Sequence, residues 1–264
     1  MLSNEYNSFF TEVDGELWIS SAGKEYNRYR GIDTKYYKLN DSTGLKGTFI
    51  QSPLFNDQNG RLWTSTYEYL CIFDKKQDKF HSFQLVINKD TVKTGYRVYY
   101  YDLKANHVYA RVGEQLAIID AKSKSILQIL GPTKGNEFAI NENTIIGSPW
   151  QNDKGIEIWK KNGNHWVRSH EYFKKCDILK KASITKSFYT SDTWWLLTTI
   201  GLVEFNENQP CASKLYTFHK EPANNAMTDG CQKGNYIFVG SDKNGVQIFD
   251  VKDRKFINQE EANE

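Results

Sequence analysis

The sequence lacks the features that mark several common classes of protein. It has no apolar run of about 18 residues, the length that a transmembrane helix needs. Its N-terminus has neither the basic start nor the apolar stretch of a secretory signal. The net charge of +2 gives no electrostatic footprint for nucleic acid. We therefore expect no membrane segment in this chain, no nucleic-acid partner and, if the chain is complete, a cytoplasmic location.

Signatures of metal binding and catalysis are also missing. The four cysteines are widely spaced, with no Cys-x-x-Cys pair, so we expect isolated apolar side chains rather than disulfides or zinc ligands. These cysteines are Cys71, Cys176, Cys211 and Cys231. The five histidines are scattered, and no Gly-x-Ser-x-Gly, Walker or dinucleotide-binding motif occurs. The sequence predicts no cofactor, no metal ion and no catalytic residue.

Helical periodicity is nearly absent, and a repeat of short strands takes its place. Only residues 170–181 show a weak helical pattern. Six times along the chain, a turn rich in Asp, Asn or Gly precedes a short apolar strand, a small-residue turn and a second strand. Trp18 and Trp63 occupy the same place in the two clearest copies and lie 45 residues apart. This period is long enough for four short strands with their turns.

Alignment of the six copies on the tryptophan gives one anchor residue per copy. The anchors are Trp18, Trp63, Tyr109, Ile145, Trp195 and Phe238, at spacings of 45, 46, 36, 50 and 43 residues. Each copy resolves into four strands that are rich in β-branched and aromatic residues. In the first copy we predict strands at 8–13, 16–20, 25–29 and 35–39, and in the second at 49–56, 62–66, 70–74 and 79–84. Anchors of this kind fill the space between neighbouring sheets.

The sequence therefore predicts an all-β fold, a β-propeller of about six four-stranded blades. Six such repeats account for nearly all of the 264 residues. We assign residues 1–258 to the propeller and residues 259–264 to a polar tail. Either the ring closes with six blades, or the chain is part of a seven-bladed or longer array.

The repeat resembles the two-component regulator propeller repeat, whose pattern is roughly Asp-x-x-Gly-x-Leu-Trp-Ile-Gly-Thr-x-x-Gly-Leu-x-x-Tyr-Asp. Residues 14–21 and 59–74 match this pattern well, 194–206 and 235–250 keep much of it, and the other two copies match poorly. The resemblance implies the sensor region of a bacterial hybrid histidine kinase or a related one-component regulator, many of which detect glycans. It implies a periplasmic location if the chain is a fragment of such a protein.

A ligand is expected at the end of the propeller that carries the turns between second and third strands. Loops on a rigid scaffold are the usual recognition surface. Several side chains there combine ring faces with planar hydrogen-bonding groups, which suits sugars. These residues are Tyr67, Glu68, Tyr96, Arg97, Arg111, Trp150 and Gln151. The alternative is that Trp150 and Tyr67 pack on neighbouring blades and that Arg97 is a solvated charge at the rim.

We therefore predict a non-enzymatic propeller that binds an oligosaccharide or a partner protein, with a homodimer as one form of the assembly. A protein-interaction scaffold without a small ligand is the first alternative. A propeller lyase or glycosidase is the second, because Glu68 and Glu114 lie in related turns of adjacent copies and leave an acid/base pair open.

Overall fold

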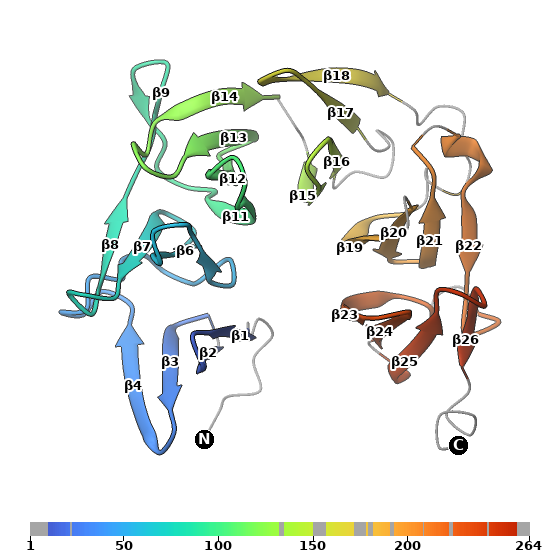
Figure 1. Ribbon diagram of the computed structural model, residues 1–264, viewed down its shortest axis with the longest axis horizontal. Helices are drawn as coiled ribbons and strands as arrows, with labels where there is room; N and C mark the ends of the chain where they lie inside the picture. Colours follow the sequence, from blue (N-terminus) through green and yellow to red (C-terminus); the bar gives the residue numbers. More distant parts are fainter. Residues whose placement is uncertain are drawn as a thin grey trace. The chain divides into compact units, whose positions relative to one another are not determined.

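The described residues form six four-stranded antiparallel sheets (Figure 1), each with its strands in chain order, and one two-stranded ribbon. The computed structural model describes residues 10–21, 23–131, 135–149, 157–171, 178, 182–190, 193–207, 209–221, 224–241 and 243–257. The fold is a β-propeller, as the repeat predicts, and each sheet is one blade. The chain divides into two compact units, residues 1–133 and 134–264, with three blades each.

The first unit, blue to green in Figure 1, holds blades 1 to 3. Blade 1 consists of β1 (Phe10–Val13), β2 (Glu16–Ser21), β3 (Glu25–Arg30) and β4 (Asp33–Lys38). Blade 2 consists of β5 (Phe55–Asn56), β6 (Leu62–Ser65), β7 (Leu70–Asp74) and β8 (Lys79–Phe83). Blade 3 consists of β11 (Arg97–Asp102), β12 (His107–Val112), β13 (Gln115–Asp120) and β14 (Ile126–Leu130). A two-stranded ribbon, β9 (Val86–Ile87) and β10 (Asp90–Thr91), lies in the connection between blades 2 and 3.

The second unit, yellow-green to red in Figure 1, holds blades 4 to 6. Blade 4 consists of β15 (Gly135–Ile140), β16 (Thr144–Pro149), β17 (Glu157–Asn162) and β18 (His165–Glu171). Blade 5 consists of β19 (Ile184–Thr190), β20 (Thr193–Thr198), β21 (Gly201–Phe205) and β22 (Lys214–Tyr216), with a short 3-10 helix η1 (Pro210–Ala212) before its last strand. Blade 6 consists of β23 (Met227–Lys233), β24 (Tyr236–Ser241), β25 (Gly245–Asp250) and β26 (Lys255–Ile257). The expected helical segment at 170–181 lies largely outside the described residues.

One predicted strand, at residues 49–56, is wrong for most of its length. β5 holds only two residues, and Ile50 forms an isolated bridge to Thr66. The Ser52 side chain explains the gap between them. The backbone N–H of Ser65 donates to Ser52 Oγ at 2.9 Å instead of to a strand carbonyl. Serine side chains compete in this way with the ladder of a sheet.

Neighbouring blades within a unit pack through opposite faces. We call the face that contacts the next blade in the chain the forward face, and the one that contacts the preceding blade the rear face. Trp18 on the forward face of blade 1 lies 5.0 Å from Phe73 on the rear face of blade 2, centroid to centroid. Trp195 of blade 5 and Phe249 of blade 6 repeat this contact at 5.1 Å. The apolar cores of each unit therefore lie between its blades.

The anchor of blade 4 lies one residue away from the predicted Ile145. Thr144 is on the forward face, because its Oγ1 donates to Glu207 after β21 of blade 5 at 2.8 Å. Ile146 shares that face and packs in one cluster with Trp194 of blade 5. Ile145 belongs to the opposite face, because successive residues of a strand alternate. A short polar residue in the anchor position explains why this copy of the repeat is hard to recognise.

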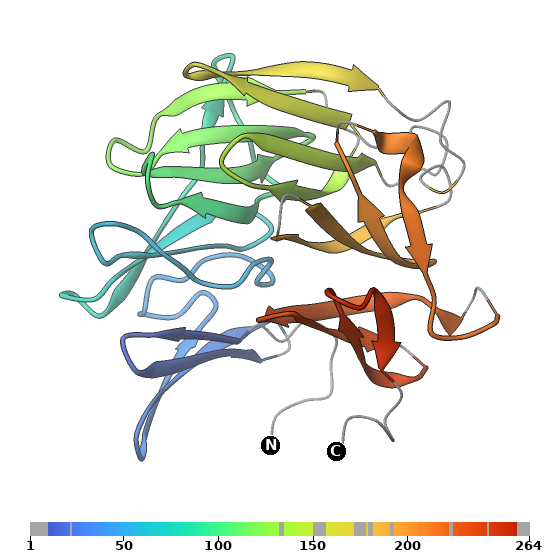
Figure 2. The same cartoon turned by 45° about the vertical axis from the view of Figure 1, so that its right-hand side comes forward.

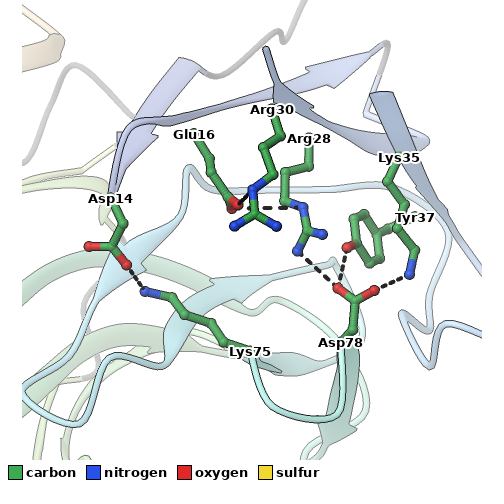
Figure 3. A network of polar contacts seen from close by, with 8 residues as sticks. All are labelled: Asp14, Glu16, Arg28, Arg30, Lys35, Tyr37, Lys75 and Asp78. Carbon is green, nitrogen blue, oxygen red and sulfur yellow. Dashed lines mark hydrogen bonds and ion pairs between the residues drawn. The ribbon is translucent and has the colours of Figure 1, made fainter. Parts of the chain in front are cut away.

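An ion-pair network closes the junction between blades 1 and 2 (Figure 3). The Arg28 guanidinium carbon lies 5.5 Å from the ring centroid of Trp18, and Arg28 donates to Asp78 at 2.9 Å. The Tyr37 hydroxyl donates to the same carboxylate oxygen at 2.6 Å, and Lys35 donates to the other one. Asp78 lies in the turn between β7 and β8. Its carboxylate therefore ties blade 2 to three side chains of blade 1.

The junction between blades 5 and 6 has the same construction with the charges reversed. Glu204 takes the place of Arg28, since each lies opposite its anchor tryptophan in the strand pairing. Arg254 in the turn between β25 and β26 takes the place of Asp78 and pairs with Glu204 at 2.9 Å. Tyr216 donates to Glu204 at 2.6 Å. We call these charge pairs, Arg28–Asp78 and Glu204–Arg254, the clamps of the two junctions. The two clamps occupy the same positions of the repeat, but the positive and the negative residue are exchanged between them.

Replacing the Asp78 carboxylate in Asp78→Asn should destabilise the protein at pH 7 by about 1–2 kcal/mol. The network is partly exposed, Lys35 loses its ion pair with Asp78, and Arg28 keeps its ion pair with Glu16. Burial alone would raise the pKa of Asp78, but hydrogen bonds from Lys35 and Tyr37 and the charge of Arg28 outweigh it and lower the pKa. The stabilisation is thus present above the unfolded-state pKa of about 3.9 and is lost as the pH falls through the lower folded-state pKa.

Urea unfolding at pH 7 and at decreasing pH measures this contribution. The stability difference between wild type and Asp78→Asn should shrink on acidification. Asp33→Asn, which alters an exposed carboxylate in the β3–β4 hairpin, serves as the control and should change stability little at either pH. A difference that stays constant down to pH 2 would contradict the assignment.

Candidate functional site

The predicted ligand face gathers where blade 2 meets the connection to blade 3. Its described members are Tyr67, Glu68, Tyr96, Arg97 and Arg111, whereas Trp150 and Gln151 lie outside the described residues. The Tyr67 carbonyl accepts hydrogen bonds from the backbone N–H groups of Gly95 at 2.7 Å and Tyr96 at 3.2 Å. Arg111 Nε donates to the Gly95 carbonyl at 3.2 Å. The structure therefore brings together residues from three separate segments of unit 1.

An aromatic stack forms one side of this face. The rings of Phe49 and Tyr67 lie 5.3 Å apart, with their planes inclined by only 13°. Phe49 is exposed and Tyr67 is half-buried, so the pair presents an aromatic surface to solvent. Phe49 escapes the sequence-based prediction because it falls in the segment assigned to a strand. Its place beside Tyr67 depends on the irregular course of the chain before β5.

The Glu68 carboxylate is oriented by its own chain. Thr48 donates to it twice, from its backbone N–H at 2.9 Å and from its hydroxyl at 2.6 Å. The backbone at Gly47 passes close to Thr66 and Glu68. A Cβ on Gly47 would lie 2.4 Å from Thr66 Oγ1 and 2.8 Å from Glu68 Oε2. Gly47 also has a φ of +125°. The segment at Gly47 and Thr48 therefore holds the Glu68 carboxylate in place. Each oxygen of this carboxylate has a second lone pair that can accept a hydrogen bond from a ligand hydroxyl.

Two arginines form the other side of the face. Arg97 on β11 and Arg111 on β12 are direct partners in the strand pairing, so their side chains leave the sheet on the same face. The Arg97 guanidinium carbon lies 5.2 Å from the ring centroid of Tyr99. Guanidinium groups can form paired hydrogen bonds with an acceptor-rich ligand.

Tyr96 is a core residue and does not fit the prediction that it contacts a ligand. Its side chain is fully buried. Its hydroxyl accepts from the Leu85 N–H at 2.8 Å and donates to the Val92 carbonyl at 2.7 Å. Burial raises the pKa of Tyr96, although the hydrogen bond from Leu85 works in the opposite direction. Tyr96 therefore fixes the two ends of the β9–β10 ribbon next to Arg97.

Metal ligands do not gather within the described residues, where no group of three or more His, Cys, Asp and Glu side chains is suited to an ion. His219 instead accepts a hydrogen bond at Nδ1 from the Glu221 N–H at 3.0 Å, which is a contact within a turn. In the same part of the chain, no helix has the length and apolar character needed to cross a membrane.

The prediction that all four cysteines are isolated apolar side chains is wrong. Cys211 in η1 is disulfide-bonded. Cys231 on β23 is a free but exposed thiol, and of the described cysteines only Cys71 is both free and buried. A disulfide depends on the distance between two Cα atoms in the fold, which the spacing of cysteines in the sequence does not reveal.

Thiol titration should distinguish these cysteines. Burial raises the pKa of Cys71 to about 12, with a smaller opposing effect of its hydrogen bond to Ser82. Because the thiolate is the reactive form, native protein at pH 8 should show one fast-reacting thiol, that of Cys231. Unfolding without reductant should expose one more. Cys231→Ser should lose only the fast phase, and a third thiol in unreduced protein would contradict the disulfide.

Comparison with known proteins gives matches in structure but not in sequence. No protein-family profile matches the chain, and no curated protein matches it. The extracellular domain of BT4673 from B. thetaiotaomicron, described both as a one-component and as a hybrid two-component system, has a TM-score of 0.75 and 17% identity over 95% of this chain. The extracellular domain of the hybrid two-component system BT3049 has a TM-score of 0.72 and 13% identity over 97% of this chain.

A third similar structure is PorZ, a surface component of the type-IX secretion system of Porphyromonas gingivalis, with a TM-score of 0.61 and 13% identity over 91% of this chain. The chain spans only 36%, 35% and 38% of BT4673, BT3049 and PorZ, respectively. Such low identities establish the fold. They agree with the resemblance of the repeat, because the chain shares its β-propeller fold with the extracellular domains of bacterial sensor systems.

Proposed function

We propose that this chain is a sensor propeller of a bacterial one- or two-component system, which binds a ligand without transforming it. The observation that carries the proposal is the surface formed by the Phe49–Tyr67 stack, Glu68 and the arginine pair. The similarity to extracellular domains of BT4673 and BT3049 supports the sensor role. The disulfide at Cys211 supports an oxidising location such as the periplasm.

An oligosaccharide is the ligand class that this surface suits best. The C–H face of a sugar ring can stack on Tyr67 and Phe49, as apolar faces do on aromatic rings. Its hydroxyl and ring oxygens can accept hydrogen bonds from Arg97 and Arg111, and a hydroxyl can donate to Glu68. Trp150 and Gln151 stay in this proposal as further contacts.

Binding would act on the connection between blades 2 and 3. The Tyr67 carbonyl bonds to Gly95 and Tyr96, and Arg111 bonds to Gly95, so a ligand on Tyr67 and Arg111 touches both sides of this connection. Such a ligand shifts an equilibrium only by the difference between its affinities for two arrangements. The ribbon β9–β10, held by Tyr96, is the element whose arrangement it would favour.

A protein-interaction scaffold is the second candidate. The similarity to PorZ, a surface component of a secretion system, favours it. The exposed ring of Phe49 would then contact a partner protein rather than a sugar.

Thermal-shift screening against oligosaccharides tests the sensor proposal. A ligand that binds only the folded state raises the melting temperature, by an amount that corresponds to about 2.7 kcal/mol at 100 times its Kd. Arg97→Ala and Tyr67→Ala should remove the shift while the unliganded proteins melt near the wild-type temperature. Arg30→Ala, an exposed arginine in the β3–β4 hairpin of the same unit, should keep the shift.

Two results would count against this assignment. If no oligosaccharide in a broad panel raises the melting temperature, the glycan part of the proposal fails. If a ligand is found but Arg97→Ala and Tyr67→Ala bind it as tightly as wild type does, the site lies elsewhere on the protein.

A further inference from the structure

A hollow lies between the outer parts of blades 5 and 6, within the second unit. Its volume is about 410 Å³, which falls in the range of roughly 300–1,000 Å³ that ligand sites have. Its lining consists of Leu215–Phe218 at the end of blade 5, and of Gln247 and Arg254–Ile257 in blade 6. Figure 2 shows these blades, blade 5 in golden brown to orange and blade 6 in red. Both walls of the hollow therefore belong to one compact unit.

The equivalent space between blades 1 and 2 is filled by the chain itself. Leu45, in the connection between β4 and β5, is fully buried and packs in one cluster with Tyr37, Cys71 and Phe80. The same connection bonds to the outer edge of blade 2, because the Phe80 N–H donates to the Thr43 carbonyl at 2.8 Å. A segment of this chain thus pairs with edge strand β8 and places one aliphatic side chain between the two blades.

The walls of the two spaces correspond residue by residue. Tyr216 corresponds to Tyr37, because each hydroxyl donates to the clamp of its junction. Phe256 corresponds to Phe80, because each pairs with the phenylalanine that packs on the anchor tryptophan. Tyr37 and Phe80 are buried, whereas Tyr216 and Phe256 are only half-buried. The rings that share a cluster with Leu45 at one junction are therefore partly uncovered at the other.

The connection between blades 5 and 6 turns back before it could fill the hollow. The backbone N–H groups of Phe218 and His219 both donate to Asn225 Oδ1 at 2.9 Å, and Asn225 Nδ2 donates to the His219 carbonyl at 2.8 Å. Asn225 is fully buried and holds the two ends of this turn together. Among the described residues of the connection, only Thr217 and Phe218 line the hollow, so none takes the place of Leu45.

The outer edge of blade 6 also offers the backbone donor that blade 2 uses. The last hairpins of the two blades have turns of the same length. The residue that ends each turn, Asp78 or Arg254, has a φ of +52° or +51°. The Phe256 N–H therefore points away from β25, as the Phe80 N–H points away from β7, and the described part of the chain holds no partner for it. Such an N–H at a sheet edge is where an extended segment pairs.

We propose that the hollow between blades 5 and 6 binds an extended segment of a partner protein. The segment pairs with the edge of β26, and its backbone carbonyl accepts from the Phe256 N–H as the Thr43 carbonyl accepts from Phe80. It places one aliphatic side chain against Tyr216 and Phe256, in the position that Leu45 takes at the other junction. The proposal does not depend on a sugar ligand.

The charge of the lining favours an acidic residue in this segment. Lys255 and Arg254, which also pairs with Glu204, line the hollow, and none of the described lining residues is Asp or Glu. In the chain's own segment, Thr43 and then Gly44 bond along β8, so the residues before Thr43 extend towards the turn that precedes β8. The corresponding turn of blade 6 carries the two cations. An acidic residue a few positions before the aliphatic one therefore complements them.

A synthetic peptide with the sequence of residues 40–47 is the probe, because it holds Leu45 with Asp41 four positions before it. Amide hydrogen exchange followed by NMR reports binding at the edge of β26. In the free protein, the Phe80 amide should exchange slowly and the Phe256 amide fast. Peptide at about ten times its Kd should slow exchange at Phe256 about tenfold, because only the unbound fraction exchanges.

Variants of the peptide and of the protein identify the contacts. Leu45→Asp in the peptide should weaken binding at least about tenfold, because the apolar burial is lost. Gln247→Phe in the protein fills the hollow from β25 and should abolish binding. Lys255→Glu should weaken binding severalfold, whereas Lys252→Glu, in the preceding turn and outside the hollow, is the matched control and should not. Circular dichroism checks that each protein variant folds.

Three outcomes would overturn the proposal. They are unchanged exchange at Phe256 with millimolar peptide, equal binding of the Leu45→Asp peptide, and unchanged binding by folded Gln247→Phe or, if that variant does not fold, by Lys255→Glu. A sugar that binds at Tyr67 and Arg97 would produce none of the expected changes at Phe256, so the failure of one proposal leaves the other standing.

Discussion

Packing of a second-strand anchor on the following blade is the interaction on which the other features of this protein depend. A four-stranded sheet cannot bury both faces by itself, and stacking of repeats supplies the missing cover. The Trp18–Phe73 and Trp195–Phe249 contacts have nearly the same length in the two units, 5.0 and 5.1 Å. At both junctions a tyrosine hydroxyl and a cation–carboxylate pair lie beside the ring. Because the charges are exchanged between the two junctions, a face of one junction would place like charges together if it met the matching face of the other.

The repeat predicts most of the fold because its signals are local. Alternation of apolar residues and turn chemistry determine the strands of blade 1 to within two residues. The misplaced anchor of blade 4 has a physical reason, since Thr144 does not look like an anchor until Glu207 and Lys160 are seen beside it. Likewise, a single serine side chain, that of Ser52, interrupts a strand that the pattern of residues favours.

The candidate site is less predictable, because the use of each side chain depends on contacts between distant segments. Tyr96 and Arg97 are neighbours in sequence, and both side chains are suited to contact a sugar. Tyr96 is nevertheless fully buried, whereas Arg97 is not. Phe49 becomes part of the site only through its stack on Tyr67, which lies in a different turn. Such features follow from the close approach of three segments around Gly47 and Gly95, where an added Cβ would meet other atoms within 2.4 to 3.2 Å.

If the following blade of the same unit is what buries an anchor, truncation of such an anchor should cost more than truncation of one that is only half-buried. The most direct measurement is the free energy of unfolding in denaturant. Trp63→Ala should lose about 3–5 kcal/mol, as buried large-to-small substitutions do. Phe238→Ala should lose clearly less, because its ring is only half-buried. Equal losses for the two variants would contradict the account.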